Sequence, residues 1–200
     1  MASTAELEKI AREVRRDLLV TIHGAGGGHT GGSLSSVDIL VALFFGVMRY
    51  TPGERTQDRD RFILSKGHSV EGYYTVLAKA GFFPQEELQT YGSYGSRLYG
   101  HPTMKIPGVE VPTGALGHGL SVGVGMAIGG KRDKSDHRVF VLMGDGEQAE
   151  GSVWEAAMAA SHYKLGNLIA IIDYNRLQIS GDVDSVMTIS SLRDRWRAFG

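Results

Sequence analysis

The sequence predicts an α/β fold, a parallel β-sheet with helices on both faces. Apolar runs at Arg61–Leu64, Val139–Met143 and Leu168–Asp173 have the length and continuous hydrophobicity of strands that are buried on both sides. Longer segments with helical spacing separate them, and alternation of strands and helices is typical of a parallel sheet. We therefore expect the carboxyl ends of the strands to share one edge, where such sheets bind ligands.

The expected helices have ordinary start and stop signals. Ser3 and Glu6 form a capping box before a helix over 5–23, which a glycine cluster ends. The other expected helices are Leu34–Met48, Ser69–Ala80, Pro84–Tyr91, Leu120–Gly130, Glu150–Tyr163 and the beginning of one at Ser191–Phe199. Gly92–Pro112 is rich in glycine and proline, so we expect an ordered loop over a site.

Composition narrows the possible functions. The 200 residues carry a net charge of −1, so nothing points to a nucleic-acid or membrane surface. Cysteine is absent, which excludes disulfides and thiolate metal sites. The charged N-terminus has no apolar signal core, and the longest apolar runs are too short to span a bilayer. We expect one cytoplasmic domain over 1–200.

Two polar side chains follow neighbouring predicted strands. Asp145 lies between glycines after one strand, and Asn175 follows the next. A site with only two or three hard oxygen ligands from the protein suits Mg²⁺, because Mg²⁺ takes its other ligands from water and phosphate oxygens. An isolated Gly-Asp-Gly is more often only a tight turn, and Asn175 alone could be a helix cap. Their pairing at two strand ends favours a Mg²⁺-bridged diphosphate site.

The stretch GDGEQAEGSVWEAAMAASHYKLGNLIAIIDYNRLQISG resembles the transketolase family of thiamine diphosphate enzymes. Further blocks carry the resemblance in the same order, namely HGAGGGHTGGSLSSVDILVALFF, DRFILSKGHS, YGHP and TGALGHGLSVGVGMA. The resemblance implies the thiamine diphosphate-binding fold of the diphosphate-binding domain. It also implies a metal site of Asp145, Asn175 and the Leu177 carbonyl, holding Mg²⁺ (or Ca²⁺ or Mn²⁺), and cofactor contacts from Gly146, Asn175, Gly114 and Leu116.

Four of the seven histidines follow a glycine, and imidazole suits proton movement at sugar hydroxyls. The resemblance places His29 and His101 at the substrate's reacting oxygens and His68 near the cofactor diphosphate. His118 stands where the family varies, so it could line the site without catalysing. The remaining ones, at positions 23, 137 and 162, are expected to be structural.

Two acids follow Asp145. Glu150 has an ordinary explanation as an acid at the start of a helix, favoured by the helix dipole. The family resemblance instead implies a catalytic carboxylate in a proton-coupled network across a subunit interface. Glu147 has no such support, and we expect it to be solvated. Trp154, Ala157, Met158 and Leu165 are expected in the core.

The resemblance implies transfer of a two-carbon glycolaldehyde unit from a ketose, or ketose phosphate, to an aldose, as in the pentose phosphate pathway. The glutamate that activates the cofactor in the family lies in a pyrimidine-binding domain that this sequence does not contain. We therefore expect a split transketolase whose C-terminal subunit supplies that domain, or a fragment truncated at its C-terminal end. A homodimer or heterotetramer is expected, and inactivity of the chain alone.

Two positions depart from the family. Gly92 stands where many relatives carry an arginine that contacts the sugar phosphate, and nearby Arg97 could substitute for it. Thr30 replaces a frequent proline. Two alternatives remain open: another thiamine diphosphate enzyme subunit, such as a 2-oxo acid dehydrogenase E1 subunit, and a non-catalytic cofactor-binding subunit. The Gly-His blocks oppose the first, and the retained site residues oppose the second.

Overall fold

A computed structural model describes residues 2–54 and 56–200. By its internal contacts the chain divides into two compact units. The first unit contains the residues up to Thr56 together with Gly67–Gly114, and the second contains Gln57–Lys66 and Ala115–Gly200. The organisation as one domain over 1–200 stays a prediction, and each unit is described by itself.

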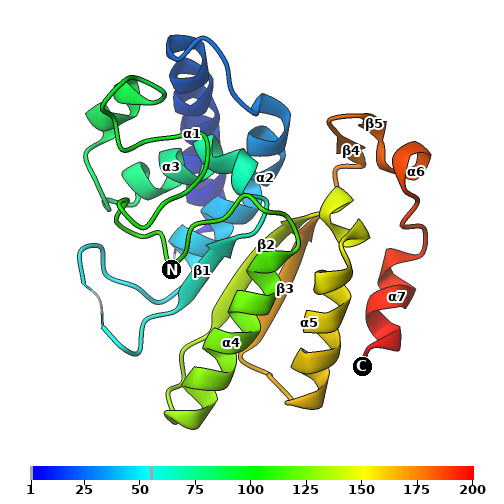
Figure 1. The fold of residues 1–200 in the computed structure, drawn as a ribbon. Helices are drawn as coiled ribbons and strands as arrows, with labels where there is room; N and C mark the ends of the chain where they lie inside the picture. Colours follow the sequence, from blue (N-terminus) through cyan, green and yellow to red (C-terminus); the bar gives the residue numbers. More distant parts are fainter. Residues whose placement is uncertain (1, 55) are drawn as a thin grey trace. The chain divides into compact units, whose positions relative to one another are not determined.

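The first unit is helical (Figure 1). Its helices α1 (Thr4–Gly24), α2 (Thr30–Ala42) and α3 (Val70–Lys79) pack against one another in all three pairs. The predicted capping box is present, since the Ser3 hydroxyl accepts from the Glu6 N–H and the Glu6 carboxylate accepts from the Ser3 N–H. Short 3₁₀ turns cover Gly67–Ser69 and Gln85–Thr90, the second within the helix predicted over 84–91.

The helix predicted over 34–48 begins earlier and changes geometry near its end. It starts at Thr30, and after Ala42 it continues as a π-helical turn over Leu43–Val47. The combined segment Thr30–Val47 is long and apolar enough to cross a membrane by length and composition alone, and 39% of it is buried. Because α2 packs against α1 and α3, its place in the core of the first unit explains why the segment is apolar.

The second unit contains the predicted parallel sheet (Figure 1). Its strands β1 (Arg61–Leu64), β2 (Val139–Gly144) and β3 (Leu168–Asp173) lie in the order β1-β2-β3, and both pairings are parallel. Leu64 pairs with Leu142, and Gly144 pairs with Asp173. The register brings the carboxyl ends of the three strands to one edge, as the sequence predicted.

Helices pack on this sheet because small residues permit close approach. Helix α4 (His118–Arg132) contacts all three strands, and α5 (Gly151–His162) packs beside α4. A Cβ atom at Gly123 would lie 2.6 Å from the Val141 Cγ2 atom, so the α4 backbone rests directly on β2. The helix predicted over 120–130 is two residues longer at each end in the structure.

The last part of the chain returns over α5. A hairpin of β4 (Leu177–Gln178) and β5 (Gly181–Asp182) leads to α6 (Val183–Val186) and α7 (Leu192–Ala198). The Phe199 ring stacks on Trp154, with ring centroids 5.3 Å apart. Met158 was expected in the core, but it lies on the outer side of α5 and is 53% exposed.

Candidate active site

The strand ends of the second unit carry the first group of site residues. Asp145 directly follows β2 and is only 2% exposed. Its Oδ1 atom accepts a hydrogen bond from the Gly146 N–H at 2.8 Å, and its Oδ2 atom accepts from the Arg176 N–H. The carboxylate therefore connects the loop after β2 to the loop after β3. The predicted proximity of Asp145 and Asn175 is present in the structure.

The loop after β3 has an unusual backbone. Asn175 uses its Oδ1 atom to accept from the Leu177 N–H at 3.0 Å, and Arg176 between them has a φ of +66°. Left-handed backbone is uncommon for residues other than glycine and is found at functional turns. The turn holds the Asn175 carboxamide and the Leu177 main chain close together, although the Leu177 side chain is 66% exposed.

The prediction that Glu147 is solvated was wrong. Glu147 is 2% exposed, and its carboxylate accepts hydrogen bonds from the Gly117 N–H at 2.7 Å, the Gly144 N–H at 3.1 Å and the Ser65 hydroxyl. Burial raises the pKa of the Glu147 carboxyl, although these three hydrogen bonds act in the opposite direction. Glu147 ties the loop after β2 to the loops after β1 and before α4.

Glu150 lies at the start of α5, where it is the N-cap residue and is exposed. Within the part of the chain that the structure describes, its carboxylate makes no hydrogen bond, so it remains accessible. A Cβ atom on Gly117 would lie 2.6 Å from the Glu150 Cβ atom. Glu150 therefore stands beside the turn that contains Leu116, which is partly exposed. Its role across a subunit interface stays a prediction.

The first unit brings three predicted site histidines together. The ring centroid of His29 lies 5.4 Å from that of His68 and 6.4 Å from that of His101. The His29 side chain is 41% exposed, so it can meet a ligand. Gly114 has a φ of +142°, and a Cβ atom there would lie 2.5 Å from the His101 ring. Only glycine lets the main chain pass this close to the imidazole.

The other histidines lie elsewhere. His118 opens α4 in the second unit and is exposed, as is His23 at the end of α1. His137 is buried and its Nδ1 atom lies 2.8 Å from the Ser135 hydroxyl. His162 packs edge-on against Tyr163. No cluster of three or more histidine or acidic side chains suitable for a metal ion occurs among the described residues.

Arg97 is the predicted substitute for the phosphate-binding arginine, and in this structure it is paired with Glu87. Its Nη2 atom donates to Glu87 at 2.8 Å, its Nε atom donates to the second carboxylate oxygen at 2.5 Å, and its Nη1 atom reaches the Lys105 carbonyl. The guanidinium beside Glu87 lowers the pKa of that carboxyl. Gly92 has a φ of +73°, a conformation that would strain an arginine. The pairing with Glu87 disfavours Arg97 as an anion ligand, and the Gly92 backbone disfavours an arginine at position 92 itself.

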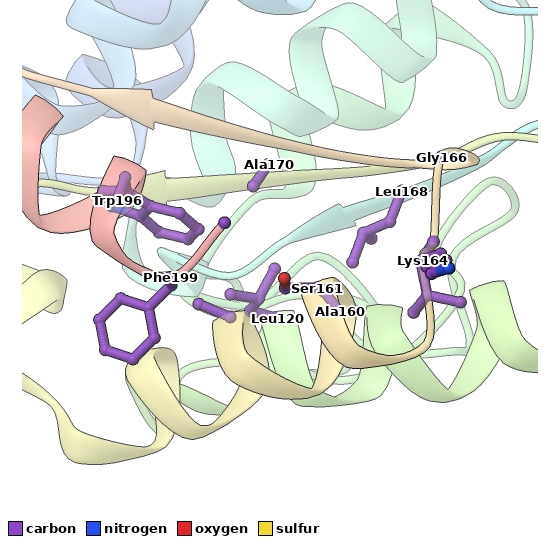
Figure 2. Close-up of a pocket in the computed structure, with 12 residues that line it drawn as sticks. Leu120, Ala160, Ser161, Lys164, Gly166, Leu168, Ala170, Trp196 and Phe199 are labelled. Carbon is purple, nitrogen blue, oxygen red and sulfur yellow. The ribbon is translucent and has the colours of Figure 1, made fainter.

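A cavity of about 510 Å³ in the second unit is lined by residues of α5, β3 and α7, together with Leu120 of α4 (Figure 2). Its lining includes Trp196, Phe199 and Lys164, and none of the predicted site residues contributes to it. Sequence reasoning missed three buried charges near the sites: Lys66, Glu71 and Glu147. The available signal was their position, since Lys66 and Glu147 closely follow buried strands and Glu71 stands in a mainly apolar helix.

A parallel sheet with a carboxylate and a carboxamide at adjacent strand ends fits a diphosphate-binding domain. Comparison with known proteins agrees, because the family model "Transketolase, thiamine diphosphate binding domain" matches residues 7–200. The chain belongs to the transketolase family and contains its thiamine diphosphate-binding domain. The predicted family and fold class are thereby confirmed.

Two curated relatives and one solved structure show the extent of the similarity. An apulose-4-phosphate transketolase subunit of Phocaeicola vulgatus is 55% identical over 195 residues, which are 97% of this chain and 69% of the relative. The 6-deoxy-6-sulfo-D-fructose transketolase subunit of a Clostridium species is 41% identical over 98% of this chain and 72% of the relative. Campylobacter jejuni transketolase superposes with a TM-score of 0.92 at 31% identity, covering all of this chain and 33% of that one.

Proposed function

We propose that this chain is the diphosphate-binding component of a split transketolase. The reaction is transfer of a two-carbon glycolaldehyde unit from a ketose to an aldose. The observation that carries the proposal is the Asp145 carboxylate bonded to the loop of Asn175 at the ends of adjacent parallel strands. Two relatives that are named as single subunits of a transketolase support a partner chain, which would supply the pyrimidine-binding domain.

The donor set of the second unit fits a divalent cation and a diphosphate. Asp145 offers a buried carboxylate, Asn175 a carboxamide, and Leu177 a main-chain carbonyl. Such hard oxygen ligands leave positions for phosphate oxygens on Mg²⁺, and Ca²⁺ or Mn²⁺ could replace it. A Cβ atom at Gly146 would lie 2.9 Å from the Gln178 Oε1 atom, so the side chain of Gln178 packs directly against this glycine. Bound thiamine diphosphate would supply the carbanion chemistry of the reaction.

The histidines of the first unit would bind the sugar oxygens and the cofactor diphosphate. His29 and His101 would hold the reacting hydroxyl and carbonyl oxygens of the sugar, and move protons at the hydroxyl. His68 would donate to the cofactor diphosphate. Their ring spacings of 5.4 and 6.4 Å place three imidazoles around one small volume, which supports a sugar with adjacent oxygens as the substrate.

The substrate is a ketose whose distal group need not be bound by this chain. Gly92 replaces the arginine of many relatives, and Arg97 is held by Glu87. Relatives are named for apulose-4-phosphate and for 6-deoxy-6-sulfo-D-fructose, so the donor could carry a phosphate or a sulfonate. Membership of the pentose phosphate pathway, a homodimer or heterotetramer, and a cytoplasmic location stay predictions.

The first test is titration of thiamine diphosphate into the purified chain by calorimetry, with Mg²⁺ and with a chelator. We expect saturable, Mg²⁺-dependent binding that is lost in Asp145→Ala. Asp133→Ala is the matched control, because Asp133 is an exposed aspartate at the end of α4. Metal-independent binding, or equal loss in both variants, would contradict the proposed metal site.

Activity is tested after the partner subunit has been added. Ketol transfer from ketose phosphates, with none from pyruvate, would favour transketolase over an E1-like subunit. Cofactor binding without turnover in an authentic complex would favour the non-catalytic alternative. Robust ketol transfer by the chain alone would contradict the need for a partner.

A further inference from the structure

Glu71 is a fully buried carboxylate in α3 that the proposed reaction does not use. Its relative exposure is 0%, and every hydrogen bond that it accepts through its side chain comes from a neutral donor. The Oε1 atom accepts from the His29 N–H at 2.9 Å and from the Tyr91 hydroxyl at 2.8 Å. The Oε2 atom accepts from the Ser33 hydroxyl at 2.8 Å. In the described part of the chain, no lysine or arginine forms an ion pair with Glu71.

The glycine-rich loop before α2 rests directly on this carboxylate. A Cβ atom at Gly28 would lie 2.5 Å from the Glu71 Oε1 atom, so only glycine lets the main chain come this close. The Nδ1 atom of His29 lies 3.9 Å from the same oxygen. That distance is too long for a hydrogen bond, so the carboxylate holds the His29 main chain and leaves the imidazole available.

A second side chain of α3 holds the main chain of His101. The Tyr74 hydroxyl donates to the His101 carbonyl at 3.0 Å. Glu71 and Tyr74 are three residues apart, so they lie on one face of the helix. The Tyr74 and Tyr91 rings meet edge to face with centroids 6.4 Å apart. Burial raises the pKa of both phenols, so both remain hydrogen-bond donors at neutral pH.

We propose that Glu71 is a positioning residue for His29, kept in place by Tyr91. One face of α3 then fixes the main chains of both histidines that would meet the sugar, whose rings lie 6.4 Å apart. This inference rests on the proposed function for the role of the histidines, but the structural claim can be measured without turnover. Since displacement of a catalytic group by about 1 Å can cost about 10²-fold in rate, the anchoring of His29 matters for catalysis.

The test compares Glu71→Ala and Tyr91→Phe with Tyr73→Phe in the full chain. Tyr73 is a buried tyrosine of the same helix, and its hydroxyl donates to the Gly108 carbonyl, away from His29. The first readout is hydrogen exchange of the His29 amide by NMR. We expect the exchange rate of this amide to increase by about 10-fold or more in Glu71→Ala and by a smaller factor in Tyr91→Phe. We expect no increase in Tyr73→Phe.

The second readout is ketol transfer in the complex with the partner subunit. We expect kcat/KM to fall about 10- to 100-fold in Glu71→Ala while the thiamine diphosphate affinity stays within about 2-fold. Unchanged His29 exchange in Glu71→Ala would overturn the inference, whatever the activity. Faster exchange with no turnover in the wild-type complex would leave the positioning claim standing and would refute the proposed function instead.

Discussion

Lys66 and Asp173 form a buried ion pair, with the Lys66 Nζ atom 2.6 Å from the Asp173 Oδ2 atom. Lys66 follows β1 and Asp173 ends β3, so the pair spans the carboxyl end of the central strand β2. The side chains are only 2% and 8% exposed. The pair therefore fixes the two outer strands at the edge from which Asp145 projects.

Removing one member of this pair should be costly. Lys66→Met leaves a buried carboxylate without its cation, and we expect the free energy of unfolding to fall by about 3–5 kcal/mol. The double variant Lys66→Met/Asp173→Asn should recover most of that loss, because the carboxylate that paired with Lys66 is then replaced by a neutral amide. Urea unfolding measures both. Arg15→Met is the control, since the Arg15–Asp38 pair is exposed and should contribute less than about 1 kcal/mol. Equal effects in Lys66→Met and Arg15→Met would contradict a buried pair.

The raised pKa of Glu147 predicts a pH dependence of stability. Between the ordinary value of 4.5 and the raised value, the folded chain binds more protons than the unfolded chain. The stabilisation from this group is thus complete below pH 4.5 and falls as the pH rises through the raised pKa. Urea unfolding at a series of pH values above 4.5 should show this slope, which Glu147→Gln should remove.

Glu155→Gln serves as the control for Glu147, because Glu155 is an exposed acid on α5. The wild-type slope should persist in Glu155→Gln. A slope that survives in Glu147→Gln would assign the pH dependence to another group.

The Arg97–Glu87 pair predicts a specificity result. If Arg97 only holds its loop to Glu87, Arg97→Met should leave the KM for a phosphorylated ketose within about 2-fold in the active complex. The half-exposed pair should contribute about 1 kcal/mol or less to stability. The comparison uses the same ketose with and without its phosphate. An increase in KM of about 10-fold for the phosphorylated donor alone would mean that Arg97 leaves Glu87 and binds the anion.

The sheet and the strand-end residues could be predicted because each depended on local pattern. The continuous hydrophobicity of residues 139–143 and 168–173 predicted buried parallel strands, and parallel order then placed Asp145 and Asn175 at one edge. The burial of Glu147 could not be predicted, because two of its three donors, Ser65 and Gly117, lie 82 and 30 positions away along the chain. Its position after a strand does not by itself distinguish a buried acid from a solvated one.

Glu71 shows the same limit in the first unit. Helical spacing correctly predicted α3, but the partners of Glu71 come from residues 20 to 42 positions away along the chain. The π-helical turn after Ala42 was also missed, because the apolar sequence continues without a break. The roles of His29, His68 and His101 came from the family resemblance, and the structure adds that their rings lie close together.

Two glycines of α4 provide a matched test of how this helix packs. At Gly125 the structure has no atom within 4 Å of an added Cβ, whereas at Gly123 the same atom would lie 2.6 Å from Val141 Cγ2. Gly125→Ala should stabilise the chain by about 0.5–1 kcal/mol through helix propensity alone. Gly123→Ala should destabilise it by about 1–3 kcal/mol, since α4 must move off β2. Both residues lie inside one helix, so the propensity gain is the same and only the contact with the sheet differs. Urea midpoints that shift in the same direction for both variants would show that α4 does not rest on β2 as described.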